Sequence, residues 1–222
     1  MSQKEITQRF ALITVILFVT LFVGIFAMRC YIDDLTATIT AKDAEIQTLN
    51  EEKTKLQAIA DEVEAAETAI RTVNPDAPAD EIHALAVRQV GKSRKYGIPR
   101  ELITYRDWSE ADLRWLDLSR KGPCGEHSTA QVWRPTFRYL RPQGDYNDMD
   151  QVYDAGTQYL ADCYKTAKRW MPNAEQKEVI RLTLAFYNAG MRHRPDEALY
   201  RARAHVRRVN GIFAKAERLG VV

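Results

Sequence analysis

Hydrophobic residues form three patterns along the 222-residue chain, and the first is an uncharged apolar run over residues 10–28. As a helix, this run rises about 28 Å, which matches the hydrocarbon core of a bilayer. It therefore predicts a transmembrane helix, preceded by a short N-terminal segment of residues 1–9. The Lys/Arg bias across the helix is nearly even, and the free N-terminal amine slightly favours a cytoplasmic position for this segment. A cleaved signal peptide is the alternative, but its apolar core would be shorter and would end in small residues. Here the run ends in Arg29 and Cys30.

The second pattern is a heptad repeat over residues 30–73, which is typical of a coiled coil. Nine of the twelve a and d positions are apolar. These twelve positions are Ile32, Leu35, Ile39, Lys42, Ile46, Leu49, Lys53, Leu56, Ala60, Val63, Glu67 and Ile70. The repeat predicts a parallel homo-oligomeric stalk. The alternative is a single amphipathic helix that packs against another surface.

The third pattern begins after residues 74–80, whose two prolines and asparagine predict a linker. Over residues 81–222, apolar residues recur at the three- and four-residue spacings of helices, and alternating strand patterns are nearly absent. We expect an all-α chain in which residues 81–222 form one helical domain of a size that can bury its own core.

Overall composition excludes few functions, because the chain is 45% hydrophobic and carries a net charge of +2. The charge is uneven, with nine Lys or Arg against three Asp or Glu from Arg181 onward. Such a basic segment suits an anionic polymer, a membrane surface or nucleic acid, and it is equally typical of a solvated helix face. The segment has no recognisable nucleic-acid-binding motif, so we expect no nucleic-acid partner.

Cysteine and histidine spacing does not predict a metal centre or a cofactor. The three cysteines, Cys30, Cys124 and Cys163, include no C-x-x-C pair, and the four histidines include no H-E-x-x-H motif. Cys124 and Cys163 either form a disulfide, if their domain lies in an oxidising compartment, or remain buried thiols.

Four short motifs in the helical part point to a family. They are "YGIPRELITYRDWSE", "GEHSTAQVWRPT", "YDAGTQYL" and "AFYNAG". Their order and spacing, over roughly residues 82–215, resemble the lytic transglycosylases of the soluble type. The resemblance implies a lysozyme-like helical fold, related to goose lysozyme, for residues 81–222, and peptidoglycan as the substrate.

The resemblance places the catalytic acid at Glu110, thirteen residues after Gly97. A general acid must hold its proton near neutral pH, and burial beside apolar groups such as Trp108 would raise its pKa. Glu126 is the rival for this role. Asp107 we expect to be solvated.

The same resemblance implies four substrate-binding residues. Gln131 would bind sugar N-acetyl or hydroxyl groups, and Ser128 stands where the family has glycine. Tyr187 would point its hydroxyl at the catalytic carboxyl, and Asn188 would shape the cleft wall. Structural interpretations remain open, such as a helix-start hydrogen bond for Gln131. The chain departs from the family at Ala111, where serine usually follows the glutamate.

The resemblance implies a lytic transglycosylase that cleaves the MurNAc–GlcNAc bond with one glutamate and leaves 1,6-anhydro-muropeptides. Because peptidoglycan lies outside the inner membrane, we expect a single-pass bacterial inner-membrane protein whose C-terminal domain is periplasmic. Enzymes of this kind serve secretion, conjugation or phage machinery. The alternative is a non-catalytic, membrane-tethered coiled-coil assembly factor, whose degenerate lysozyme-like domain binds glycan or protein.

Overall fold

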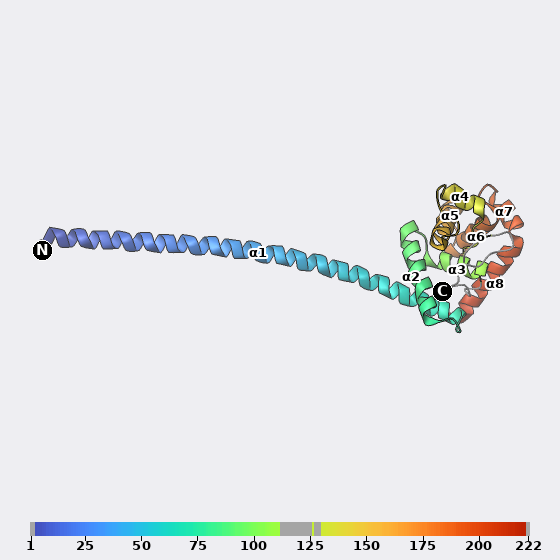
Figure 1. The fold of residues 1–222 in the computed structure, drawn as a ribbon, viewed down its shortest axis with the longest axis horizontal. Helices are drawn as coiled ribbons and strands as arrows, with labels where there is room; N and C mark the ends of the chain where they lie inside the picture. Colours follow the sequence, from blue (N-terminus) through green and yellow to red (C-terminus); the bar gives the residue numbers. More distant parts are fainter. Residues whose placement is uncertain (1–2, 112–125, 127–129, 221–222) are drawn as a thin grey trace. The chain divides into compact units, whose positions relative to one another are not determined.

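The computed structural model describes residues 3–111, 126 and 130–220, and their regular structure is helical throughout (Figure 1). The helices are α1 (Gln3–Val73), α2 (Ala79–Tyr96), α3 (Arg100–Ala111), α4 (Arg134–Leu140), α5 (Met149–Trp170), α6 (Gln176–Ala189), α7 (Pro195–Arg201) and α8 (Arg203–Leu219). The chain divides into two compact units, Met1–Ala58 and Ile59–Val222, so α1 runs through the first unit and into the second. The prediction of an all-α chain is confirmed for the described residues.

The first unit is a length of α1 that carries the apolar run. Large apolar side chains from Phe10 to Met28 are 54–72% exposed. The hydroxyls of Thr14 and Thr20 donate to main-chain carbonyls four residues earlier, so neither hydroxyl needs water. With a mean hydropathy of 2.4 in its most apolar window, α1 is long and apolar enough to cross a membrane.

The heptad stripe is exposed in the first unit. Its apolar a and d side chains are 47–66% exposed, and they are Ile32, Leu35, Ile39, Ile46, Leu49 and Leu56. Within a single chain, no described side chain covers these positions. The coiled coil therefore stays a prediction that requires a second helix.

The second unit begins earlier than the expected domain. Its first residue is Ile59, in the last turns of α1, whereas the sequence suggested a linker at residues 74–80 before the domain. Ala66 and Ile70 are fully buried in the hydrophobic core, and Val63 packs against it. The boundary moves because the heptad positions Val63 and Ile70 find apolar partners in their own chain.

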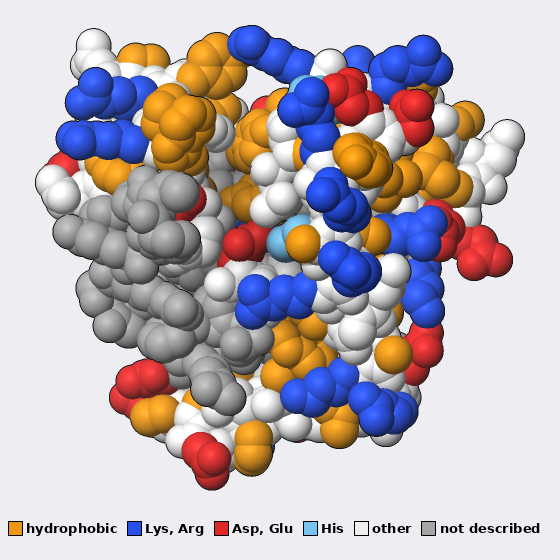
Figure 2. Space-filling view, turned by 90° about the vertical axis from the view of Figure 1, so that its right-hand side faces the viewer, with side chains coloured by type: hydrophobic (Ala, Val, Ile, Leu, Met, Phe, Trp, Pro, Cys, Tyr) orange, Lys and Arg blue, Asp and Glu red, His pale blue; other side chains and the backbone are white. Residues whose placement is uncertain are grey.

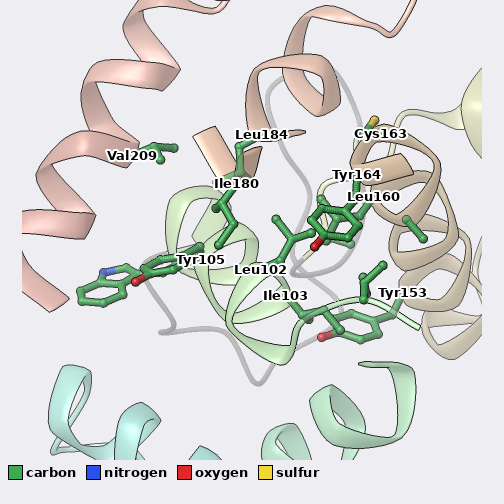
Figure 3. Close-up of a cluster of buried hydrophobic side chains, with 14 of the residues drawn as sticks. Leu102, Ile103, Tyr105, Tyr153, Leu160, Cys163, Tyr164, Ile180, Leu184 and Val209 are labelled. Carbon is green, nitrogen blue, oxygen red and sulfur yellow. The ribbon is translucent and has the colours of Figure 1, made fainter. Parts of the chain in front are cut away.

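Helix α3 lies at the centre of the second unit. Its Leu102 and Ile103 are fully buried, and Figure 3 shows side chains of α5 and α6, such as Leu160 and Ile180, gathered around them. Helix α5 packs against α6, α6 packs against α7 and α8, and α3 contacts both α2 and α8. The C-terminal end of α3, which carries Glu110, is therefore held by the core.

The prediction of a solvated Asp107 is wrong, because this carboxylate is completely buried. Its Oδ1 lies 2.7 Å from Nη2 of Arg106, which is also completely buried. The Tyr153 hydroxyl and the Gln89 amide donate to its Oδ2 at 2.8 and 2.9 Å. A buried carboxylate is tolerated when a cation and hydrogen-bond donors compensate it, as they do here.

Candidate active site

A cleft of about 1090 Å³ opens in the second unit, and it brings together residues that are far apart in the sequence. Glu110 from the end of α3, Gln131 from the segment before α4, and Tyr187 and Asn188 from the end of α6 all line it. Ser128 lies outside the described residues. Four of the five residues expected at the site thus share one cleft.

Glu110 has the environment of a general acid. Its side chain is 17% exposed. Burial raises its pKa to about 7. The positive charges of Arg106 and Arg208 lower the pKa, whereas the negative charges of Glu126 and Asp107 raise it slightly further. The carboxyl therefore retains its proton at mildly acidic pH and releases it near neutrality, which suits proton transfer in both directions.

Trp108 does not supply this burial. Residues two apart point to different sides of a helix, so Trp108 and Glu110 cannot share a face. Trp108 instead lines a small separate pocket with Ala69 and Ala216, and its ring lies 5.4 Å from Nζ of Lys215. The expectation that Trp108 flanks the catalytic carboxyl is therefore wrong.

Gln131 is held in an unusual backbone conformation. Its φ of 47° lies in the left-handed region, which costs a non-glycine residue about 1–2 kcal/mol. Hydrogen bonds on both sides hold it there. The Tyr187 hydroxyl donates to the carbonyl of Ala130 at 2.6 Å, and the Tyr146 hydroxyl donates to that of Val132 at 2.5 Å. Strain of this kind is common where a side chain must be aimed into a site.

Gly156 in α5 packs closely against this segment. A Cβ added at Gly156 would lie 2.5 Å from Val132 Cγ2 and 2.7 Å from Ala130 Cβ. It would also lie 3.1 Å from the Tyr187 hydroxyl oxygen. Only glycine lets α5 approach the segment this closely, which gives a physical reason for the glycine in the "YDAGTQYL" motif.

The Tyr187 hydroxyl donates to a different partner from the one expected. A tyrosine hydroxyl has a single proton, and Tyr187 donates it to the Ala130 carbonyl. It therefore does not donate to Glu110. Its ring lies beside that of Tyr159, with centroids 5.4 Å apart, and burial raises the pKa of the Tyr187 hydroxyl above its ordinary value. Its described contacts position the Gln131 segment.

The cleft contains a second carboxyl group and exposed aromatic rings. Glu126, the rival acid, is half-buried and lines the same cleft. Trp133 and Tyr139 line it with exposed rings, whose apolar faces suit the apolar face of a sugar ring. Asn188 is exposed. Helix α6 ends at the next residue, Ala189, and is followed by Gly190, whose φ of 98° favours glycine.

One neighbour of the site was not identified from the sequence. His205 in α8 places Nδ1 3.8 Å from Oε1 of Glu110, and its side chain is 9% exposed. Burial and the positive charge of Arg208 lower the pKa of His205 to about 4. Figure 2 shows that Lys and Arg side chains are numerous over one face of the molecule. His205 belongs to no motif and is far from Glu110 in sequence, so only the fold brings them together.

No cluster of three or more His, Cys, Asp or Glu side chains that could hold a metal ion occurs in the part of the chain that the structure describes. Cys163 is a buried free thiol, and burial raises its pKa well above the ordinary value. Its suggested disulfide partner, Cys124, lies outside the described residues. Comparison of the chain with protein-family models, with curated proteins and with solved structures finds no match.

Proposed function

We propose that the chain is a membrane-anchored lytic transglycosylase that cleaves the MurNAc–GlcNAc bond of peptidoglycan. The observation that carries the proposal is Glu110, a largely buried carboxyl with a pKa of about 7 that lines a cleft of about 1090 Å³. The motif resemblance supports it, because the cleft brings together residues of three of the four motifs: Glu110, Gln131, and the neighbours Tyr187 and Asn188.

In this reaction Glu110 acts first as acid and then as base. It donates its proton to the glycosidic oxygen, the bond from that oxygen to C1 of MurNAc breaks, and the oxygen leaves as the 4-hydroxyl of GlcNAc. The Glu110 carboxylate then takes the proton of the MurNAc C6 hydroxyl, whose oxygen bonds to C1. The product is a 1,6-anhydro sugar. A pKa near the working pH suits both transfers.

The proposed location rests on α1. Its exposed apolar run would anchor the chain in the bacterial inner membrane. The unit that contains the cleft would then lie in the periplasm, where peptidoglycan lies. Secretion, conjugation or phage machinery crosses the cell wall there. The exposed heptad stripe would join copies of the chain.

Cysteine cross-linking tests the coiled coil. In a Cys30→Ser background, Leu35→Cys at a d position should cross-link between chains under mild oxidation. Ala37→Cys at an outer f position should not, and equal cross-linking would exclude the coiled coil.

Digestion of purified peptidoglycan tests the activity. We would incubate the full chain in detergent micelles with sacculi and identify the released muropeptides by mass spectrometry. The expected products end in 1,6-anhydro-MurNAc. Glu110→Gln should reduce their formation at least about 100-fold, since general acid catalysis contributes that much or more. Glu101→Gln, at the half-exposed start of the same helix and outside the cleft, is the matched control and should leave the rate unchanged.

Two other outcomes would replace the proposal. Hydrated reducing ends would indicate a hydrolase, in which the second carboxyl of the cleft, Glu126, activates water. Glu126→Gln would then abolish cleavage. Binding to sacculi without any cleavage by the folded chain, unchanged by Glu110→Gln, would indicate the non-catalytic assembly factor.

A further inference from the structure

His205 is a buried side chain with one nitrogen directed at the proposed catalytic acid. Nδ1 is the atom nearest to Glu110, 3.8 Å from Oε1. Nε2 is buried and has no hydrogen-bond partner among the described residues. The distance at Nδ1 is longer than a hydrogen bond, but hydrogen bonds in unliganded active sites are often long and tighten when substrate binds.

A proton on Nδ1 therefore has very different surroundings from a proton on Nε2. A neutral imidazole carries one proton, on either Nδ1 or Nε2. On Nδ1 the proton faces a carboxyl oxygen of Glu110 that can accept it. On Nε2 it would be a buried donor without an acceptor in the described part of the chain, which is destabilising. The surroundings of His205 favour the Nδ1–H tautomer.

The same surroundings keep the ring neutral. A second proton would have to bind the buried Nε2, and Arg208 on the same helix adds positive charge nearby. Other charged or titratable groups also act on Glu110. They are Arg106 and Asp107 on α3, Tyr187 on α6 and Glu126 before α4. Burial and the charge of Arg208 both disfavour a second cation at the position of His205.

We propose that His205 is the positioning residue for Glu110, held as a neutral Nδ1–H imidazole that donates to Oε1 of the carboxyl. This inference rests on the proposed function for its consequence, but its chemistry can be tested without any substrate. It goes beyond the acid–base role of Glu110, because it states which carboxyl oxygen carries the proton.

This hydrogen bond would determine which oxygen of the Glu110 carboxyl carries the proton. When Oε1 accepts from Nδ1–H, the proton of the acid resides on Oε2 and is available to the glycosidic oxygen. Once Glu110 has given that proton away, the same Nδ1–H donates to the carboxylate and stabilises its charge. His205 neither gains nor loses a proton, so one fixed tautomer serves both steps.

Nitrogen NMR of the imidazoles tests the tautomer directly. Full-length chain in detergent micelles, labelled only with ¹⁵N-histidine, contains four imidazoles, and His205→Gln assigns the one of interest. Long-range ¹H–¹⁵N spectra distinguish Nδ1–H, Nε2–H and imidazolium forms. At pH 6 we expect His205 as Nδ1–H. An Nε2–H tautomer or a protonated ring at this pH would overturn the inference.

Two substitutions test the positioning role. The amide nitrogen of Asn occupies nearly the place of Nδ1, whereas that of Gln occupies nearly the place of Nε2. His205→Asn should therefore keep most of the activity, and His205→Gln should lower kcat about 10- to 100-fold, as loss of a hydrogen bond to a charged group predicts. In the Gln variant the basic limb of the kcat profile should also move to higher pH, because the carboxylate has lost its donor.

A role in packing alone predicts the reverse order, because Gln is closer to His in volume than Asn is. Retained activity in His205→Gln with loss in His205→Asn would therefore contradict the inference. His83→Gln, at an exposed histidine of α2, is the matched control and should change neither kcat nor the pH profile. If no variant cleaves peptidoglycan while NMR shows Nδ1–H, the proposed function fails and the tautomer assignment stands.

Discussion

The ionisation of Glu110 couples the proposed chemistry to the stability of the fold. Its pKa is about 7 in the folded chain and 4.5 ordinarily. Between these values the folded state binds more protons than the unfolded state, so the free energy of unfolding falls as pH rises from 4.5 to 7. The difference corresponds to about 3 kcal/mol above pH 7. The buried carboxyl of the proposed active site thus destabilises the fold at the pH where it ionises.

Replacing Glu110 with Gln should remove this pH-dependent loss, because the amide stays neutral. We expect Glu110→Gln to be more stable than the parent chain by up to about 3 kcal/mol at pH 8 and nearly equal to it at pH 4. Urea denaturation at both pH values measures this. Glu101→Gln should leave the pH dependence unchanged. A Glu110→Gln variant equally stabilised at both pH values would show that the carboxyl is not the titrating group.

Gly156 makes a second prediction at the scale of a single residue. Gly156→Ala should destabilise the unit by about 1–3 kcal/mol, because the new methyl group would overlap Val132 and Ala130. Gly91→Ala in α2 is the control, since its Cβ would meet nothing within 4 Å. That variant should be stabilised by about 0.5–1 kcal/mol, the ordinary effect of alanine within a helix. Thermal denaturation of both variants distinguishes a glycine that close packing requires from an ordinary helical glycine.

Among the elements of the unit, α5 and α6 fix the cleft wall through the segment of Gln131. Tyr187 on α6 and Tyr146 before α5 each hold one carbonyl of that segment, next to the backbone strain at Gln131. Tyr187→Phe should therefore destabilise the chain by about 1 kcal/mol and raise KM for peptidoglycan, through loss of one hydrogen bond. Because its proton does not go to Glu110, the pH dependence of stability should keep its shape.

Measured side by side, Tyr187→Phe and Tyr146→Phe should behave alike, since each removes one bond to the same segment. Denaturation at pH 4 and pH 8 gives the comparison without an activity assay. A large change in pH dependence in Tyr187→Phe alone would restore the role first expected for Tyr187, as a donor to the catalytic carboxyl.

How far the sequence predicts each element depends on how local its determinants are. The apolar run of residues 10–28 and the helical periodicity of the domain follow from neighbouring residues, and both appear as helices. The motif residues Gln131 and Tyr187 do share a cleft with Glu110. The surroundings of Glu110 could not be predicted, because they depend on α8, a helix without any motif. His205 is therefore visible only in the folded chain.

The misplaced residues have a similar explanation. Asp107 reads as a surface residue because its compensating partners, Arg106 aside, lie on other helices. Trp108 is only two residues from Glu110 in sequence, but this spacing points the two side chains to different sides of the helix. At the end of α1, the heptad spacing of Val63 and Ile70 is nearly the same as the spacing of any amphipathic helix face, so the pattern cannot say which surface they pack against.

On the scale of the whole molecule, α1 carries three different surfaces in succession. Its apolar run is suited to a bilayer, its exposed heptad stripe to another helix, and its last turns to the core of the second unit. One ion pair and one hydrogen bond support this last contact. Nη2 of Arg94 lies 2.9 Å from Oε1 of Glu62, and Nδ1 of His83 lies 2.5 Å from Oε1 of Glu67. The single helix α1 thus carries the apolar run, the heptad stripe and the first residues of the second unit, and the break expected at residues 74–80 follows it, between Val73 and Ala79.

This continuity predicts where the second unit can be cut. A fragment of residues 59–222 should be more stable than one of residues 75–222 by at least about 3 kcal/mol, because the shorter fragment loses the burial of Ile70, Ala66 and Ala69. It would also uncover Trp108, which lines a pocket with Ala69. Thermal denaturation followed by tryptophan fluorescence should show a lower midpoint and a red-shifted native spectrum for the shorter fragment.

A point substitution makes the same test without cutting the chain. Ile70→Ala in the full chain should lower the stability of the second unit by about 2–5 kcal/mol, as a large-to-small change in a core does. Ile46→Ala, at an exposed heptad position of the first unit, should leave the unfolding midpoint of the second unit unchanged. Equal midpoints for Ile70→Ala and Ile46→Ala would mean that the last turns of α1 belong to the stalk, and that the second unit folds without them.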